Sequence, residues 1–388
     1  MNRADVAIVG AGPSGAWAAH LLARQGARVL LFDPSHPREK PCGGGVTSRA
    51  LSIVSSALAD EPLPAVEIER ATFRNARGAR VDVPLQAAGG VRDLVVASRA
   101  AFDGRLVDAA RRSGAAHVPA RVTGIARENG GFRVETAAGT FSAAWLVGAD
   151  GANSLLRGRL AQRFGRAQIS VATGFFVHGA TSRQVILEFT GDPPGYIWSF
   201  PRPDHLAIGI CAQADAGTTV GSLRERTARW MRDVDVARDR TTTPYSWPIP
   251  SLGARDLETL RVGGPGWLLV GDAAGLVDPI TREGIFFALE SAQLAANAIA
   301  SGRARADDDY EAALRADVLA ELAAAARLKA GFFRPRFTAL LLDALRESSH
   351  VRRVMADLIS GAQPYRGLKW RLARTFDWGL ARRALTVR

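Results

Sequence analysis

The 388-residue chain lacks the features that mark several classes of protein. Its two cysteines, Cys42 and Cys211, are too few for a disulfide framework, so we expect a reducing compartment. No apolar run reaches the ~18 residues that a membrane-spanning helix needs, and no basic segment followed by an apolar stretch indicates a secretion signal. The sequence contains no internal repeat, metal-ligand cluster, Ser/His/Asp hydrolytic set or nucleic-acid-binding motif. We therefore expect a soluble or peripheral cytoplasmic protein that binds no metal and no nucleic acid.

Acidic residues are also scarce: 38 Asp and Glu stand against 50 Lys and Arg, which gives a net charge of +12. A solvated surface explains such an excess, and so does attraction to an anionic membrane. Residues 364–388 contain seven basic residues and one acid, with Leu368, Leu372, Phe376 and Leu380 at four-residue spacing. This pattern predicts a basic amphipathic helix at the inner face of a membrane. A helix docked on its own domain is the alternative.

The first 33 residues follow the order strand, glycine-rich turn, helix, strand, acid. The turn has the spacing Gly-x-Gly-x-x-Gly at residues 10–15. Gly10 allows a tight turn, Gly12 lets the backbone approach a pyrophosphate, and Gly15 lets helix and strand pack closely. The N–H groups at the start of the helix attract phosphate, and Asp33 can accept hydrogen bonds from a ribose. The element predicts a dinucleotide site without choosing between FAD and NAD(P).

A second glycine-rich segment, Pro41-Cys42-Gly43-Gly44-Gly45, follows Lys40. Three glycines beside a cysteine form a loop that can lie flat against a planar ring, and a flexible turn is the alternative. Arg99 opens a predicted helix that contains Asp103 one turn later. In that position the arginine can reach a phosphate or a neighbouring backbone; a solvated surface arginine is the alternative.

Two later buried strands end in glycine and an acid. One precedes Gly148-Ala149-Asp150-Gly151, and the other precedes Gly271-Asp272. Pro279 then leads into residues 281–285, which begin a predicted helix to about residue 300. Together with the N-terminal turn, these segments resemble the two-domain FAD fold of the para-hydroxybenzoate hydroxylase type.

That resemblance implies roles for particular residues. The aspartate of the Gly-Asp pair, here Asp272, would hold the ribityl chain and pyrophosphate. The helix that starts at Gly284 and Ile285 would point its N-terminus at the flavin pyrimidine. FAD is the implied cofactor, with NADPH, another reductant or an electron-donor protein as the transient electron source. The predicted cofactor-binding residues are Gly10, Gly12, Ser14, Gly15, Asp33, Cys42, Gly43, Gly44, Arg99, Asp150, Gly271, Asp272, Pro279, Gly284 and Ile285.

The middle of the chain is predicted to form β-strands. The expected strands are 169–178, 184–190, 194–201 and 206–211. Alternation places Tyr196, Trp198 and Phe200 on one face of their strand. Three aromatic side chains on one sheet face can wall an apolar tunnel above a flavin, and an aromatic core face is the alternative.

Two segments resemble the signatures of the geranylgeranyl reductase family. Residues 196–201 match its Tyr-x-Trp-x-Phe-Pro pattern, and residues 40–45 match its Lys-Pro-Cys-Gly-Gly-Gly pattern. These enzymes reduce isolated C=C bonds, so the resemblance implies a hydrophobic prenyl-chain substrate bound by Tyr196, Trp198 and Phe200. Arg282 departs from the pattern, because many members have glycine there. Its guanidinium could favour an anionic reduced flavin, meet an anionic substrate head or point to solvent.

The mechanism implied by the family is transfer of hydride from flavin N5 to one alkene carbon and of a proton to the other. Cys42 is the first candidate for the proton donor, Tyr196 is the second and ordered water is the third. Trp198 is a further catalytic candidate. Cys211 lies within a predicted strand, so we expect it to be a small core residue.

We expect an α/β fold, α+β in part, with a Rossmann-like FAD-binding domain, an antiparallel-sheet substrate domain and a C-terminal helical region. The FAD-binding domain is predicted to comprise residues 1–60, 95–165 and 262–305, and the substrate domain residues 61–94 and 166–261. The C-terminal region is predicted to comprise residues 306–388, with helices over 310–333 and 337–346. A FAD-dependent monooxygenase or halogenase on the same fold is the first alternative to a reductase. A non-catalytic lipid-binding flavoprotein is the second.

Overall fold

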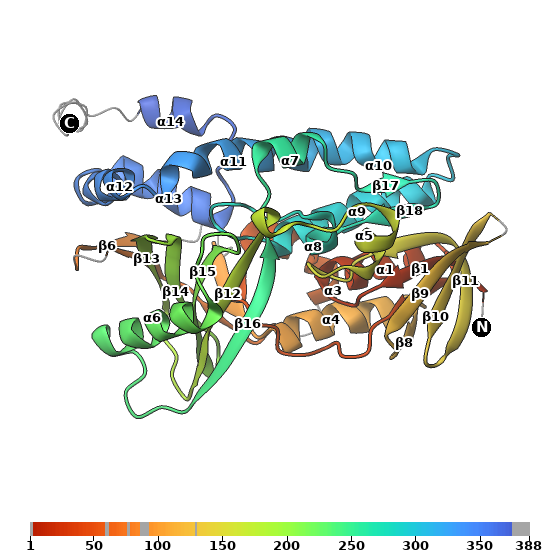
Figure 1. The fold of residues 1–388 in the computed structure, drawn as a ribbon, viewed down its shortest axis with the longest axis horizontal. Coiled ribbons are helices and arrows are strands. Elements are labelled where there is room, and N and C mark those ends of the chain that lie inside the picture. The colour runs from red at the N-terminus through yellow and green to blue at the C-terminus, as the bar shows by residue number, and fades with distance from the viewer. Residues whose placement is uncertain (1–2, 59–61, 76–77, 86–92, 129, 375–388) are drawn as a thin grey trace.

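The computed structural model describes all residues except 1–2, 59–61, 76–77, 86–92, 129 and 375–388. Two lobes, each built around its own sheet, lie side by side, and the C-terminal helices run along one side of both (Figure 1). No helix in the described part of the chain is long and apolar enough to cross a bilayer.

The first lobe is a mixed sheet whose central strands are parallel. Its strands are β1 (Arg3–Val9), β2 (Val29–Phe32), β8 (Ala116–Val118), β9 (Val122–Glu128), β10 (Gly131–Thr136), β11 (Gly139–Gly148), β17 (Gly263–Gly264) and β18 (Trp267–Leu269). The main path runs β17-β18-β11-β1-β2-β8, while β9 and β10 form an antiparallel extension. β1 is buried along most of its length, as strands of parallel sheets are.

The helices that cover this sheet are α1 (Pro13–Arg24), α4 (Arg99–Arg112) and α9 (Ile285–Ala300). Two of these helices begin at the edge where the parallel strands end, and α1 packs against both others. The predicted strand-turn-helix-strand unit at the N-terminus is confirmed. The helix starts at Pro13, within the glycine turn, because proline is well suited to the first helical position.

The second lobe is a seven-stranded sheet in the order β16-β12-β15-β14-β13-β5-β6. Its strands are β5 (Arg70–Asn75), β6 (Arg80–Pro84), β12 (Ile169–His178), β13 (Gln184–Gly191), β14 (Pro194–Pro201), β15 (His205–Gln213) and β16 (Thr242–Pro250). Neighbours are antiparallel apart from β13 and β5. Helix α6 (Val220–Asp233) packs on one face through Leu223 and Trp230. The opposite face carries Tyr196 and Trp198.

A small sheet and several short helices join the lobes. The sheet has the order β3-β7-β4, from Gly45–Thr47, Leu94–Ala97 and Ala65–Glu67. The short helices are α2 (Ser48–Ile53), α3 (Ser55–Leu58), α5 (Leu155–Leu160), α7 (Ala254–Glu258) and α8 (Gly271–Ala274), with a 3-10 turn at Arg166–Gln168. Strand β3 begins at the last glycine of the cysteine loop, so the small sheet fixes where that loop ends.

The C-terminal region is helical, as predicted, but is divided differently. Its helices are α10 (Ala306–Leu314), a π-helical segment (Arg315–Leu319), α11 (Ala320–Phe332), α12 (Pro335–Glu347), α13 (Ser349–Ser360) and α14 (Leu368–Arg374). The sequence predicted one helix over 310–333 and did not predict α13. Helices α12 and α13 contact strands of the second lobe. The predicted membrane-surface helix lies mostly outside the described residues, because only its first part, α14, is described.

Candidate functional site

A large cavity is lined by residues of both lobes and of the C-terminal helices. Its empty volume is about 1840 Å³, including the open space at its mouth. One end is polar and includes Gly12, Ser14, Arg99 and Asp272. The other end is apolar. It is lined by Phe73, Leu187, Phe189, Tyr196, Trp198, Ile249, Phe332, Met355, Leu358 and Ile359. The cavity thus joins a polar end to an apolar end.

The polar end is built on the first glycine turn. Gly10 has a φ of 101°, and a Cβ there would lie 2.3 Å from the Ala149 oxygen. A Cβ on Gly15 would lie 1.8 Å from the Gly10 oxygen, so both positions require glycine. A Cβ on Gly12, by contrast, would have His36 Nε2, 3.9 Å away, as its nearest described neighbour. Gly12 therefore presents open backbone to the cavity.

The start of α1 faces the same end of the cavity. Among the described residues, no side chain makes a capping hydrogen bond at its N-cap. The first N–H groups of a helix need partners, and they carry partial positive charge. A pyrophosphate fits this place, because Gly12 leaves the space and α1 supplies the donors.

Asp33 is held by its own chain. Its Oδ2 accepts hydrogen bonds from Ala11 N at 2.9 Å and from His36 Nδ1 at 2.9 Å, and its Oδ1 accepts from Ser35 N at 2.7 Å and from His36 N at 2.9 Å. Burial raises the pKa of Asp33, but the hydrogen bond and charge of His36 outweigh burial, so the net pKa is well below its usual range. The carboxylate is therefore ionised and fixes the loop that follows β2.

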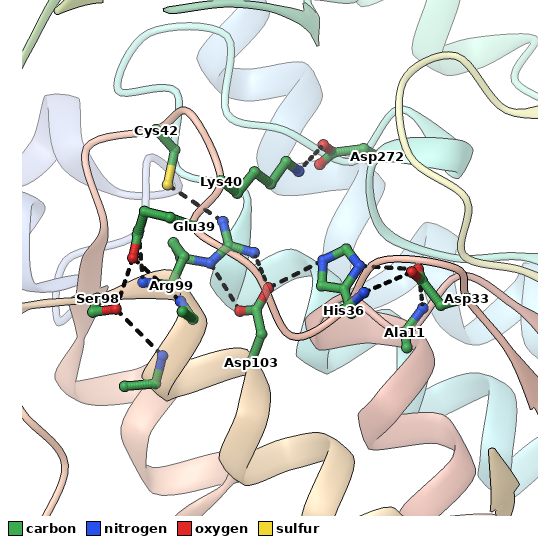
Figure 2. A network of polar contacts seen from close by, with 12 residues as sticks. Ala11, Asp33, His36, Glu39, Lys40, Cys42, Ser98, Arg99, Asp103 and Asp272 are labelled. Atoms are coloured by element: carbon green, nitrogen blue, oxygen red, sulfur yellow. Dashed lines mark hydrogen bonds and ion pairs between the residues drawn. The ribbon is translucent and has the colours of Figure 1, made fainter. Parts of the chain in front are cut away.

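His36 links Asp33 to a second buried carboxylate (Figure 2). Its Nε2 lies 3.4 Å from Asp103 Oδ2, and Asp103 accepts two hydrogen bonds from Arg99, at 2.7 and 2.8 Å. Burial lowers the pKa of His36, but hydrogen bonds and charges from Asp103 and Asp33 raise it more, so the net pKa is raised. Arg99 in turn donates from Nη1 to Cys42 Sγ at 3.3 Å. A continuous row of charged groups thus connects the glycine turn to the cysteine loop.

A buried arginine anchors the cysteine loop from the other side. Arg202 is fully buried and donates from Nη2 to the Cys42 oxygen at 2.6 Å. It also pairs with Glu39, which accepts hydrogen bonds from Ser98 Oγ and Arg99 N at the start of α4. Arg202 Nη2 lies 3.8 Å from Cys42 Sγ. Two guanidinium groups therefore point at one sulfur atom.

The two signature segments of the sequence touch in space. A Cβ on Gly43 would lie 3.1 Å from the ring of Phe200, and one on Gly45 would lie 3.2 Å from it. Gly44 has a φ of 82°, and a Cβ there would lie 2.6 Å from the Ala97 oxygen. The glycines are thus required by the close approach of Phe200 and of strand β7.

The alternation predicted for β14 is confirmed. Tyr196, Trp198 and Phe200 line the cavity, while Ile197 packs on the other face of the sheet against α6. The Tyr196 hydroxyl donates to the Thr281 oxygen at 2.6 Å. The phenol proton is therefore engaged with the turn before α9, which ties the aromatic strand to that turn.

Asp272 and the residues before α9 complete the polar end. Lys40, from the cysteine segment, lies 3.3 Å from Asp272 Oδ2. Glu283 accepts hydrogen bonds from Thr47 Oγ1 at 2.8 Å and from Arg49 Nη2 at 2.5 Å. The N-cap of α9, Gly284, makes no side-chain capping bond with any described residue. The first N–H groups of this helix thus face the cavity next to Asp272.

Most of the predicted site residues meet at this cavity. Those that line it are Gly12, Ser14, Cys42, Gly43, Gly44, Arg99, Tyr196, Trp198, Phe200, Asp272, Gly284 and Ile285. Gly10, Gly15 and Gly271 shape the turns behind it, and Asp33, Asp150 and Pro279 lie outside its lining. Asp150 accepts hydrogen bonds from Ser154 Oγ at 2.5 Å and from Leu156 N at 3.2 Å, so in this structure it caps α5.

Sequence reasoning missed several residues of the site. Arg202 follows the aromatic signature directly, and a charge next to buried aromatic residues was the available signal. His36 lies three residues after Asp33, but its link to Asp103 depends on tertiary structure. The lining from α11 and α13 had no sequence signal, because Phe332 and Met355 look like ordinary helix core.

Comparisons with known proteins agree with this geometry. A model of the FAD binding domain family matches residues 3–310. The menaquinone reductase of Mycolicibacterium smegmatis is 30% identical over 321 residues, covering 78% of this chain and 77% of that protein. The digeranylgeranylglycerophospholipid reductase of Methanothrix thermoacetophila is 30% identical over 329 residues, covering 80% and 81%.

Solved structures share the fold. A geranylgeranyl bacteriochlorophyll reductase-like protein from Thermoplasma acidophilum has a TM-score of 0.78 at 22% identity, covering 97% of this chain and all of that one. A flavin-dependent brominase has a TM-score of 0.71 at 19% identity, covering 92% and 94%. The predicted α/β flavoprotein fold is confirmed.

The position of His36 between two carboxylates predicts a pH-dependent stability. Its ordinary pKa is 6.5 and folding raises it, so its contribution is fully present below pH 6.5 and is lost as the pH rises through the raised value. We expect His36→Gln to lower the free energy of unfolding by about 2 kcal/mol at pH 6 and by clearly less at pH 9. Urea unfolding at both pH values measures this. His350→Gln, at an exposed position, is the control; an equal loss at both pH values would contradict a charged His36.

Proposed function

The chain belongs to the geranylgeranyl reductase family of FAD-dependent flavoproteins, and we propose that it hydrogenates isolated C=C bonds of a polyprenyl lipid. The observation that supports this is the cavity itself. Its polar end offers a phosphate-sized cradle at Gly12, and its apolar end continues into a slot walled by Tyr196, Trp198 and Phe200. A cofactor and an oily chain can therefore meet at the cysteine loop between the two ends.

The residues present fit FAD. Gly12, Ser14 and the start of α1 would hold the pyrophosphate, and Asp272 would bind the ribityl chain beside the open N-terminus of α9. When bound, FAD supplies the hydride for reduction of the double bond. The protein's own part is to bind, orient and protonate the substrate.

The apolar end of the cavity suits an isoprenoid tail. An isolated alkene offers no polar handle, so its position depends on shape and on exclusion of water. Strand β14 supplies aromatic walls, and Phe332, Met355 and Leu358 from the C-terminal helices close the opposite side. Burial of one prenyl unit after another provides binding energy in proportion to apolar area.

We propose Cys42 as the proton donor. Its sulfur receives a hydrogen bond from Arg99 and lies within reach of Arg202. When the thiol gives up its proton, these two guanidinium groups stabilise the negative charge that remains. Tyr196 would first have to release its hydrogen bond to Thr281, so its hydroxyl is less suited to this step.

The reductant and the membrane surface belong to the same proposal. NADPH or an electron-donor protein would reduce the cofactor. Trp370, on α14, is 77% exposed, which supports a lipid-facing role for the segment that begins there. A prenyl lipid would then enter the cavity from the inner face of a membrane.

The first prediction concerns the proton donor. We expect Cys42→Ser to slow alkene reduction by about 100-fold, because a hydroxyl is a far weaker acid than a thiol. The measurement is mass spectrometry of a geranylgeranyl lipid after anaerobic turnover with dithionite, with the absorbance of bound flavin as a check on cofactor content. Cys211→Ala, at a buried position in β15, is the control. Full turnover in Cys42→Ser would remove Cys42 from the chemistry.

The second prediction concerns the apolar slot. Met355 lines it from α13, so Met355→Trp should fill part of its volume. We expect reduction of a geranylgeranyl substrate to fall at least about tenfold while a geranyl substrate is spared, since crowding of this kind costs ~1–3 kcal/mol. Arg353→Trp places the same ring on the exposed side of the same helix. Equal losses for both chain lengths would argue against a prenyl slot at this place.

The third prediction concerns the membrane. Binding to anionic vesicles should weaken as salt is raised, because screening reduces the attraction of basic residues. A deletion of residues 364–388 should lose most of this binding. Co-flotation with vesicles at two salt concentrations measures both effects, with neutral vesicles as the control. A truncated protein that floats as well as the full chain would exclude this segment as the membrane contact.

A further inference from the structure

Two carboxylates lie beside the N-cap of α9, where this helix meets the cavity. Glu283 directly precedes the N-cap residue, Gly284, and both residues line the cavity. A Cβ built on Gly284 would lie 3.4 Å from Asp272 Oδ1, so the second carboxylate is next to the same residue. Negative side chains at a helix N-terminus offset the partial positive charge of its first N–H groups. The start of α9 can therefore favour an anion in the cavity only if both carboxylates are neutralised.

Each carboxylate is paired with a cation from the segment around the cysteine loop. Lys40 Nζ lies 3.3 Å from Asp272 Oδ2 (Figure 2). Arg49 Nη2 donates to Glu283 Oε2 at 2.5 Å. The side chains of this second pair are 22% and 15% exposed, so solvent screens their attraction weakly. Glu283 thus enters the cavity wall as one half of a neutral pair.

Arg49 lies outside the cavity lining and contacts Glu283 from behind. Its guanidinium lies over the Phe286 ring in the first turn of α9, 3.8 Å from the ring centroid. Its Nη1 is 3.8 Å from Glu321 Oε1, on α11. A Cβ on Gly361, the residue that ends α13, would lie 2.3 Å from Arg49 Nε, so glycine leaves the room that the arginine needs. Contacts from α9, α11 and the end of α13 together fix the guanidinium against Glu283.

The charge of Glu283 matters because of what the start of α9 faces. Reduction of a flavin adds negative charge to its ring system, and the N–H groups at a helix N-terminus favour such charge. A carboxylate without a cation, at the same end of the helix, would oppose it, since charges repel strongly where little water intervenes. Neutralisation of Glu283 by Arg49 removes this opposition.

We propose that Arg49 is a positioning residue that raises the reduction potential of the bound flavin by neutralising Glu283. The inference rests on the FAD site proposed above, which places the start of α9 at the flavin, and it does not depend on the identity of the substrate. Arg49 acts through Glu283 and touches neither cofactor nor substrate. The helices that cover the slot supply part of its seat, through Glu321 and Gly361.

The test measures the flavin reduction potential of FAD-loaded protein by anaerobic equilibration with a reference dye. The variants are Arg49→Met, Glu283→Gln and the double variant that carries both changes. Methionine keeps a flexible apolar side chain against the Phe286 ring, and glutamine keeps the shape of glutamate. Arg74→Met is the matched control, because it breaks an ion pair of similar burial, with Glu188 at 3.2 Å, in the second lobe.

We expect Arg49→Met to lower the equilibrium ratio of reduced to oxidised flavin about tenfold, which is a shift of about 30 mV to more negative potential for two electrons. Glu283→Gln should shift the potential in the opposite direction, because it leaves the charge of Arg49 without its main partner. The double variant should return close to the wild-type potential, and Arg74→Met should not change it.

A shift of the same sign in both single variants would overturn the proposal, because a purely structural defect has no reason to reverse its sign. An unchanged potential in Arg49→Met would also overturn it. If Arg49→Met does not fold, Glu283→Gln decides alone, and a potential equal to or below that of the wild type would contradict the proposal. No prenyl substrate is present in this measurement. A protein that shows the expected shifts but reduces no alkene would therefore refute the reductase function and support the role of Arg49.

Discussion

The contact between Phe200 and the glycines of the cysteine loop is the constraint on which the site depends. The ring approaches Gly43 and Gly45 so closely that a Cβ at either position would crowd it. Arg202, two residues later, donates a hydrogen bond to the carbonyl of Cys42. Because the end of β14 supplies the ring and the residue after it supplies the guanidinium, the second lobe helps to position the cysteine loop.

Alternating charges extend this constraint across the first lobe. Asp33, His36, Asp103 and Arg99 follow one another at hydrogen-bond or ion-pair distance and end at Cys42. Each buried charge has an opposite neighbour, which is what allows so many ionised groups below the surface. The row joins the loop after β2 to the start of α4. A substitution of any residue in this row is therefore expected to affect both the glycine turn and the cysteine.

Local patterns predicted much of this structure, and tertiary contacts account for the rest. The turn at residues 10–15 and the alternation in β14 depend on neighbours in sequence, so both could be predicted. Asp33 is predicted to bind a ribose, but its hydrogen bonds with Ala11 and His36 could not be predicted, because they depend on how the loop after β2 folds back. The extent of the slot could not be predicted, since Met355 reaches it only through the packing of α13 on β6.

The apolar slot and the cofactor cradle are built in part by different segments of the chain, so mutations can change one without the other. The match to the FAD binding domain family ends at residue 310, and the helices that cover the slot begin at Ala320. Mutations in α11 and α13 can thus reshape the ceiling of the slot without altering the cradle for the dinucleotide. Drift in the last eighty or so residues could therefore change which apolar molecule fits the slot, while the FAD-binding part stays unchanged.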